Sequence, residues 1–321
     1  MKTLLVELVP RGPFVTPWQG DTLFGQLCWV LAHRHGKEWL DNRLKDYVAG
    51  NPFLVVSDPL PAGYLPSPAV LWSPEPPAKK QDPEEDYKQL RKRRWRRRGA
   101  AVTSSQDRSQ DRSEKGIWGE DVTTAPAHHN TIDRRSGTTG TGAFAPFSVK
   151  QHWYPPEARL ECWLLFDPQR LGQEVLCEAL AQLGQTGYGK KASTGMGRFD
   201  LGKVAEESLP RQAGSKTWQT LAPCAPQGCG FDPERSRYQV FTRFGRHGDH
   251  LALGGRPFKQ PLLLARTGAL LTPDSFDAGR LFVGRGLGGD GRLSQVMPVT
   301  VHQGYAPVVG VNVAWKEDHH G

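Results

Sequence analysis

The strongest chemical signal in the sequence is a glycine-rich segment with interleaved cations, GYGKKASTGMGR, at residues 187–198. Glycine tolerates positive φ and lets another chain approach closely, so its N–H groups can point at phosphates. The basic and hydroxyl side chains add charge and hydrogen bonds, and the tyrosine ring offers a stacking face. We therefore predict that this segment binds a nucleic-acid backbone, with a flexible, solvated connection as the alternative. The candidate contacts are Gly187, Tyr188, Gly189, Lys190, Lys191, Ser193, Thr194, Gly195, Gly197 and Arg198.

This segment differs from the two common nucleotide-binding loops. A Rossmann fingerprint follows a strand and opens a helix, whereas residues 187–198 follow a predicted helix and lead into a predicted strand. A Walker A motif requires GxxxxGK followed by Ser or Thr, and the chain has no such string. The five cysteines are scattered, with no second pair at zinc spacing. The sequence therefore predicts no nucleotide cofactor and no metal site.

A second polar group lies at residues 128–135, HHNTIDRR. A ribonuclease site would use a histidine as general base and an arginine to stabilise the phosphorane, without a metal. Binding without chemistry would place Asn130 and the arginines on phosphates or base edges, and the simplest interpretation is a loop that satisfies local backbone groups. We favour binding; catalysis would instead use His128 or His129. The candidate contacts are His129, Asn130, Asp133, Arg134 and Arg135.

Charge is concentrated in one segment. The chain has 41 Lys and Arg against 33 Asp and Glu, a formal net charge of +8, and residues 79–115 alone hold 13 basic and 7 acidic side chains. Proteins with such a basic segment commonly bind nucleic acid. The run around Trp95 is expected either to follow an RNA backbone without sequence recognition or to be a solvated charged helix. Its candidate non-specific contacts are Arg91, Lys92, Arg93, Arg94, Arg96, Arg97 and Arg98.

Hydrophobic patterning predicts an α+β framework that positions these groups. In the first half, strands are expected at 2–8, 53–57, 161–168 and 197–202. Helices are expected at 22–35, 38–48 and 170–183. Asp21 is the expected N-cap of the first helix, and Gly20 before it is a weak candidate for the approach of RNA. Residues 78–127 are expected to form a long insertion that is partly helical at its start.

The second half predicts a strand-rich domain. Strands are expected at 238–244, 261–271 (a hairpin), 280–284, 297–301 and 306–315. A break near 203–215 separates a domain at 1–205, which contains the insertion 78–127 and the glycine-rich loop 187–197, from a domain at 212–321.

Three strings occur in the order GDTLFGQLCW (20–29), HNTIDRRSGTTG (129–140) and GYGKKASTGMGRF (187–199). Together they resemble the RAMP subunits numbered four in type III-A CRISPR effector (Csm) complexes, which are Cas-five-like subunits that cap the 5′ end of the CRISPR RNA. The resemblance continues in FKQPLLLARTG (258–268) and QGYAPVVGVNV (303–313), so it covers nearly the whole chain outside the insertion. The glycine-rich loop alone marks only the RAMP superfamily, and the combination of strings is more specific.

The resemblance implies two ferredoxin-like (RRM-like) domains and a non-catalytic, cofactor-free role in antiviral defence. It implies binding of the repeat-derived 5′ tag of the CRISPR RNA (crRNA), and contact with the large polymerase-type subunit and a backbone RAMP subunit. A β-hairpin thumb in this family reaches the guide–target duplex, which makes target RNA a further partner. The insertion 78–127 is longer and more basic than the family leads us to expect, so the thumb's boundaries within 78–146 stay open.

Two alternatives remain from the sequence. One is a metal-independent endoribonuclease of the RAMP superfamily that processes repeat RNA, although such enzymes usually carry their glycine-rich loop near the C-terminus and this loop ends about 120 residues before it. The other is the equivalent subunit of a neighbouring type III subtype.

No apolar stretch is long enough to span a membrane, and residues 1–10 resemble a strand rather than a signal peptide, so we expect no membrane contact and a cytoplasmic protein.

Overall fold

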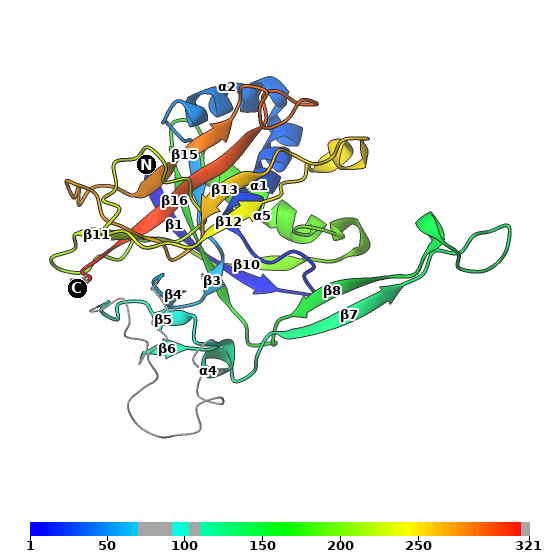
Figure 1. The fold of residues 1–321 in the computed structure, drawn as a ribbon, viewed down its shortest axis with the longest axis horizontal. Helices are drawn as coiled ribbons and strands as arrows, with labels where there is room; N and C mark the ends of the chain where they lie inside the picture. Colours follow the sequence, from blue (N-terminus) through cyan, green and yellow to red (C-terminus); the bar gives the residue numbers. More distant parts are fainter. Residues whose placement is uncertain (70–91, 103–109, 316–321) are drawn as a thin grey trace, which may run out of the picture.

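The computed structural model describes residues 1–69, 92–102 and 110–315. The first half is built on an antiparallel sheet whose main strands lie in the order β10-β1-β9-β2 (Figure 1). Helix α1 (Gly20–His35) follows the first of these strands along the chain, and α5 (Gln173–Thr186) precedes the last. This is the βαββαβ arrangement of a ferredoxin-like fold. The strands are β1 (Lys2–Pro10), β2 (Leu54–Val56), β3 (Leu60–Pro61, also paired with β9), β9 (Leu160–Phe166) and β10 (Phe199–Glu206).

Burial explains why these segments form this sheet. β9 is nearly continuously apolar, and all but one of its side chains are buried, as in strands that are covered on both faces. Helix α5 is amphipathic and turns Leu176, Leu180 and Leu183 toward the core. The predicted elements of this half therefore agree with the structure, apart from shifts of a few residues at their ends.

The chain between β3 and β9 is an insertion into the ferredoxin-like unit. Its first part is a small sheet of β4 (Tyr64–Pro66), β5 (Trp95–Arg97) and β6 (Asp111–Arg112), followed by α4 (Glu114–Trp118). From Trp95 onward the basic run is therefore a strand, and the expectation of a charged helix there is wrong. The candidate contact Arg91 lies outside the described residues.

The second part of the insertion is a two-stranded arm. Strands β7 (Thr123–His129) and β8 (Phe147–Trp153) pair along their whole length and project from the body, with the short 3-10 turn η1 (Gly142–Phe144) near the tip (Figure 1). At its base, Phe14 and His152 exchange two backbone hydrogen bonds of 2.9 and 2.7 Å. This pairing anchors the arm to the segment that follows β1.

The second half contains a four-stranded sheet in the order β14-β11-β16-β15 and a separate ribbon of β12 and β13. The expected hairpin at 261–271 is wrong, because β13 pairs with β12 while β14 pairs with β11. The strands expected at 297–301 and 306–315 are one long strand that begins at Val301. The bounds are β11 (Thr217–Thr220), β12 (Val240–Arg243), β13 (Leu262–Ala265), β14 (Leu270–Leu271), β15 (Phe282–Gly288) and β16 (Val301–Val311).

Between residues 212 and 315 the structure has the 3-10 turn η3 (Asp249–Leu253) but no α-helix. A second ferredoxin-like domain, with helices on its own sheet, is therefore not confirmed. Helices α1 and α2 (Lys37–Val48) of the first half lie against β16 and β15 instead. The hydroxyl of Tyr305 donates to the backbone oxygen of Tyr47 at 2.8 Å, which ties this sheet to α2.

Gln303 joins the two halves through its side-chain amide. Its Oε1 accepts from the backbone N–H of Val56 at 2.9 Å, and its Nε2 donates to the carbonyl of the same residue at 2.8 Å. Gln303 is fully buried, so the amide satisfies the edge of β2 as a further strand would. One hydrophobic core cluster accordingly contains residues of both halves, from Leu4 to Val313. Among the described helices, none is both long enough and apolar enough to cross a membrane.

Candidate nucleic-acid interface

The loop after α5 is held against the body by its own backbone. The N–H groups of all four glycines donate within the protein: Gly187 to Leu183 O, Gly189 to the side chain of Gln26, Gly195 to Ala192 O and Gly197 to Pro13 O. These amides are therefore engaged, and the expectation that the glycine amides form a phosphate nest is wrong.

The glycines serve close packing within the chain. Gly197 has φ +73°, and a Cβ at this position would collide with the backbone of Tyr188. A Cβ on Gly187, at φ +102°, would collide with the carbonyl oxygen of Met196. Glycine is therefore required at both positions because the loop folds back on itself, whether or not RNA is bound.

Tyr188 is part of the core. It is fully buried, its ring stacks on Trp18 with 4.4 Å between centroids, and its hydroxyl donates to Pro17 O at 2.9 Å and accepts from Gln19 N at 3.0 Å. The expectation that this ring offers a stacking face to a base is therefore wrong. A tyrosine inside a glycine-rich segment is expected to be exposed to solvent. The sequence gives no sign of the contacts with residues 17–19 that bury this side chain.

The side chains of the loop remain available. Lys190, Ser193, Thr194 and Arg198 are exposed, and Lys191 is partly exposed. Ser193 and Thr194 lie in the η2 turn (Ala192–Thr194) of the loop. The loop can therefore contact phosphates through cations and hydroxyls rather than through its glycine amides.

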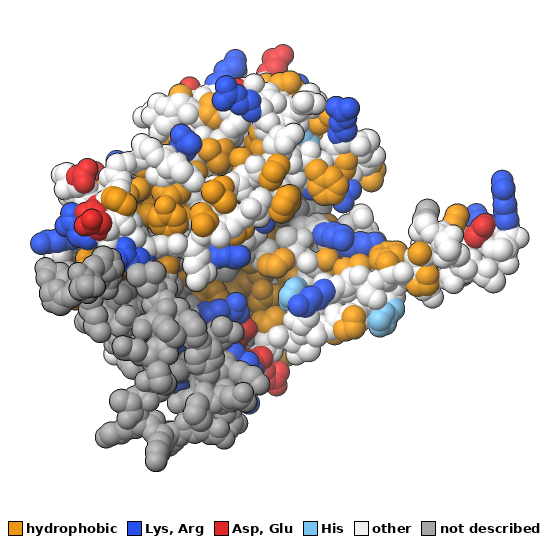
Figure 2. Space-filling view, in the orientation of Figure 1, with side chains coloured by type: hydrophobic (Ala, Val, Ile, Leu, Met, Phe, Trp, Pro, Cys, Tyr) orange, Lys and Arg blue, Asp and Glu red, His pale blue; other side chains and the backbone are white. Residues whose placement is uncertain are grey.

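The arm brings one residue of the second predicted cluster, His129, to this loop. The ring of His129 stacks on Phe147 with 5.1 Å between centroids, and the ammonium of Lys191 lies 5.1 Å from the centroid of the same Phe147 ring. Deeper at the base of the arm, the amide of Gln151 donates to the sulfur of Met196 at 3.6 Å. Figure 2 shows basic and hydrophobic side chains together where the arm leaves the body. The structure thus brings His129 and Lys191, far apart in sequence, to one place.

The rest of that cluster lies at the tip of the arm, away from the loop (Figure 1). Asn130, Arg134 and Arg135 are exposed there. Asp133 accepts from the backbone N–H of Arg135 at 2.9 Å and pairs with Thr138, so it closes the turn of the tip. The structure therefore gives Asp133 a local role and does not support it as an RNA contact.

The two histidines of the arm are poorly placed to act together. Successive residues of a strand point to opposite faces, so His128 and His129 face away from each other. The Nδ1 of His128 lies 2.8 Å from the hydroxyl of Ser148 on the paired strand, whereas His129 stacks on Phe147. An acid–base pair on one phosphate therefore cannot be formed from these two residues.

The basic run around Trp95 is largely matched by acidic side chains. Arg96 is buried and donates through Nε to Asp111 at 2.9 Å, and the Asp111 side chain is fully buried. Lys92, Arg94 and Arg98 reach carboxylates of the insertion, of β9 or of the residue after β10, while Arg97 is exposed. These residues therefore hold the insertion together, which contradicts their role as a free cationic track for RNA. The pairs are Lys92–Asp121, Arg94–Glu114, Arg96–Asp111, Arg98–Glu161 and Arg98–Glu207.

Gly20 is buried, and a Cβ at this position would collide with the backbone of Val56 and Ser57. Its N–H donates to the carboxylate of Asp58 at 2.6 Å. The expected approach of RNA to Gly20 is therefore wrong, because the residue packs on the end of β2. The expected N-cap is also wrong: α1 begins at Gly20, with Gln19 in the N-cap position.

Asp21 lies in the first turn of α1 and binds the second half. Its carboxylate lies 2.8 Å from Nε of Arg243 and 3.2 Å from Nε2 of His302. Burial alone would raise the pKa of Asp21, but the hydrogen bond from His302 and the charges of His302 and Arg243 lower it overall. The carboxylate is therefore a structural anchor between the halves.

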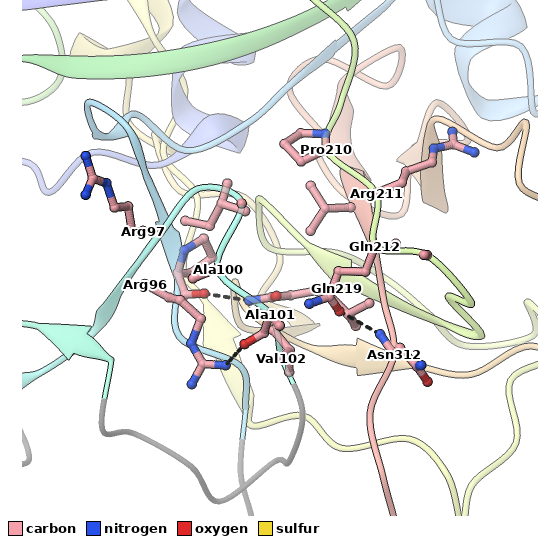
Figure 3. Close-up of a pocket in the computed structure, with 17 residues that line it drawn as sticks. Arg96, Arg97, Ala100, Ala101, Val102, Pro210, Arg211, Gln212, Gln219 and Asn312 are labelled. Atoms are coloured by element: carbon pink, nitrogen blue, oxygen red, sulfur yellow. Dashed lines mark hydrogen bonds between the residues drawn. The ribbon is translucent and has the colours of Figure 1, made fainter.

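A pocket of about 390 Å³ lies between β5 and the end of β16. Its polar groups are bonded to one another: Gln219 donates to Pro66 O at 2.5 Å, and Gln212 accepts from Asn312 N at 2.8 Å. Figure 3 shows the guanidinium groups of Arg97 and Arg211 pointing away from each other rather than converging on a ligand. In the part of the chain that the structure describes, no group of three potential metal ligands is present either.

The first half is a ferredoxin-like sheet with a loop rich in glycine and cations between its last helix and last strand. The resemblance to RAMP proteins led us to expect both features. No protein-family model matches the chain, and no curated protein matches it either. The particular likeness comes from solved structures.

A chain of a crystal structure of the Csm1–Csm4 cassette in complex with pppApA is 16% identical, with 98% of this chain and 99% of that chain covered and a TM-score of 0.53. A chain of the cassette in complex with cA4 gives 16% identity, coverage of 98% and 100%, and a TM-score of 0.54. A chain of the Csm3–Csm4 subcomplex of a type III-A CRISPR–Cas interference complex gives 13%, coverage of 97% and 100%, and a TM-score of 0.56. Csm4 is the component that these complexes share. The resemblance to this family is therefore confirmed at the level of the fold.

Proposed function

We propose that this protein is a non-catalytic RNA-binding subunit of a type III CRISPR interference complex, which holds the repeat-derived 5′ tag of the crRNA. The observation that carries the proposal is the meeting of the cationic loop and the arm at Phe147, where Lys191 lies on the ring that stacks on His129. The likeness to chains of Csm1–Csm4 and Csm3–Csm4 complexes supports it through the fold.

The proposed mechanism is recognition without turnover. Lys190, Lys191 and Arg198 contact phosphates, and the hydroxyl of Ser193 adds a hydrogen bond. His129 and Phe147 supply the stacking face that was expected from Tyr188. Splayed tag bases are thus held between the loop and the His129–Phe147 pair of the arm, while base pairing by the guide reads the target.

The proposed partners follow from the same assignment. The large polymerase-type subunit and a backbone RAMP subunit contact the outer faces of the chain, and the arm is the thumb that meets target RNA at the end of the guide duplex. The exposed arginines Arg134 and Arg135 at the tip would contact a phosphate backbone there.

The first experiment is to purify the tagged protein from its host and sequence the small RNA that accompanies it. We expect guide RNAs that share one repeat-derived 5′ end, together with a large subunit and backbone RAMP subunits. RNA with heterogeneous 5′ ends, combined with cleavage of added repeat RNA that is lost on His128→Ala or His129→Ala, would replace this proposal with the endoribonuclease alternative.

A second experiment tests the site with a synthetic RNA that carries that 5′ end. Replacing Lys190, Lys191 and Arg198 with Gln removes up to three phosphate contacts, so we expect the slope of log K against log salt to fall by about 2 and affinity to drop at least tenfold. Lys45→Gln, an exposed lysine on α2, is the matched control and should change neither quantity. Equal affinities for the triple variant and the control would contradict the site.

A further inference from the structure

A second concentration of cations lies in the second half of the chain. Residues 235–266 contain seven Arg and Lys and one acidic residue, Asp249. They form the ribbon β12–β13 and the turn between its strands. Two of these cations, Arg235 and Arg243, form ion pairs with Asp232 and Asp21 outside the segment. Arg246 donates to the backbone oxygen of Ala252 at 2.7 Å, and Arg256 donates to the side chain of Gln295 at 3.2 Å. Both acceptors are neutral, so these contacts leave the positive charge unmatched, unlike the ion pairs around Trp95.

Two aromatic rings stand exposed among these cations. Phe244 is 72% exposed and Phe258 is 69% exposed. The guanidinium of Arg246 lies 5.7 Å from the centroid of Phe258. Figure 2 shows hydrophobic side chains gathered on this face of the body above the arm. Exposed rings beside unmatched cations are typical of surfaces that stack the bases of single-stranded nucleic acid.

Helix α1 connects this turn to the glycine-rich loop. The side chain of Gln26 accepts from the N–H of Gly189 at 3.1 Å, which places the loop on α1. Within the next two turns of the same helix, His33 lies 2.7 Å from Asp249 of η3, and Gly248 leaves room for the ring of Trp29. The two cationic surfaces are therefore mounted on successive turns of one helix.

A glycine lies on α1 beside the first attachment point, one residue before Gln26 and one turn before Trp29. Gly25 is partly exposed, and a Cβ at this position would meet nothing within 4 Å. Glycine destabilises a helix interior relative to alanine, and no atom of the described chain requires it at this position. Close approach of another molecule to the helix backbone would require it.

We propose that single-stranded RNA continues from the loop 187–198 across Gly25 to the turn between β12 and β13, where Phe244 and Phe258 stack on bases and Arg246 contacts a phosphate. This inference rests on the proposed function and extends it to a second surface. Arg246 and Arg256, whose acceptors are neutral, and the helix glycine favour RNA over a protein partner, which would instead use aliphatic side chains such as Leu253.

The test measures fluorescence anisotropy of the full chain with two labelled, unstructured RNAs of mixed sequence, 8 and 20 nucleotides long. The double variant Phe244→Ala/Phe258→Ala should raise Kd about tenfold or more for the longer RNA and change it little for the shorter RNA, which the loop can hold alone. Phe244→Trp should keep the affinity, and Leu253→Ala, which removes a side chain that is 91% exposed in the same turn, should not alter it. An unchanged Kd for the double variant would overturn the proposal.

Gly25→Ala should change two measured quantities in opposite directions, stability upward and RNA affinity downward. Alanine should raise the Tm, because the helix gains propensity and no clash arises, and it should weaken binding of the longer RNA about tenfold. A higher Tm with unchanged affinity would assign the glycine no role in binding and contradict the path across α1.

The outcomes also separate this inference from the proposed function. If the loop variant loses both RNAs while the Phe244 and Phe258 variants keep the longer one, only the second surface fails. If none of the variants changes Kd, both proposals fail. If Leu253→Ala prevents recovery of a partner subunit while RNA binding is unaffected by any change in this turn, the surface belongs to a protein partner.

Discussion

The role of a charged side chain in this protein depends on the partner that the fold brings to it. Arg96 and Arg97 are adjacent in the same basic run, yet one is buried against Asp111 and the other is exposed on β5. The same contrast separates buried Tyr188 from exposed Lys190, two residues apart in one loop. Residue type therefore indicates which interactions a side chain can make, and burial decides whether another molecule can reach it.

The buried pair gives a prediction at this scale. Asp111→Ala leaves the guanidinium of Arg96 without its carboxylate, so we expect a loss of about 3–5 kcal/mol in the free energy of unfolding. Arg97→Ala, on the neighbouring exposed residue, should change it by less than about 0.5 kcal/mol. Urea denaturation of both variants checks this. If both variants changed the free energy of unfolding by a similarly small amount, the Arg96–Asp111 pair would not stabilise the insertion.

At the scale of elements, the arm is used by the proposed function but is not needed by the hydrophobic core. Its two strands form a sheet of their own and meet the body at a few points: the bridge between Phe14 and His152, the contact of Gln151 with Met196, and the contact of Phe147 with Lys191. The tip carries exposed hydrophobic residues, including Ile132 at 58%. An element that projects exposed apolar groups is typical of a contact with another molecule.

Shortening the arm tests whether its tip contributes to the stability of the fold. Deletion of residues 131–145 with Pro146→Gly joins the paired residues His129 and Phe147 through Asn-Gly, a sequence that favours a type I′ turn. We expect the Tm to change by less than about 3 °C, because no core contact is removed. Binding of the short RNA should persist, since Lys191 and Phe147 remain. A large fall in Tm would show that the tip supports the fold.

At the scale of the whole molecule, the two halves form one packed unit. Gln303 completes the edge of β2, and Asp21 binds Arg243 and His302. Asp58 accepts from Gly20 N at 2.6 Å and from the hydroxyl of Thr267 at 2.5 Å. Because buried polar groups on both sides depend on these contacts, we expect the halves to unfold in a single transition.

Asp58 gives this interface a pH dependence. Burial raises its pKa to about 7, although hydrogen bonds from Thr267 and Gly20 oppose the shift. Between about pH 4 and 7 the folded state therefore binds more protons than the unfolded state, and the contribution of Asp58 to stability falls as pH rises. Burial lowers the pKa of His152 and His247, so the contribution of these two histidines to stability rises with pH. The measurement must therefore isolate the contribution of Asp58.

The measurement is the difference in unfolding free energy between the wild type and Asp58→Asn from pH 4 to 8. We expect the variant to gain stability relative to the wild type as pH rises to about 7, and the difference to level off above it. A difference that is constant across this range would contradict the raised pKa.

The sequence by itself determined the local elements of the first half and the positions of the loop and the histidine cluster, because helical and strand periodicity and glycine spacing act over short distances. It also supported the family resemblance that the fold confirms. It did not separate Arg96 from Arg97 or reveal that Tyr188 is buried, and it predicted only a strand over the residues that include Phe244. Only the tertiary structure decided which cations remain available to a ligand, because their acidic partners and covering side chains come from distant parts of the chain.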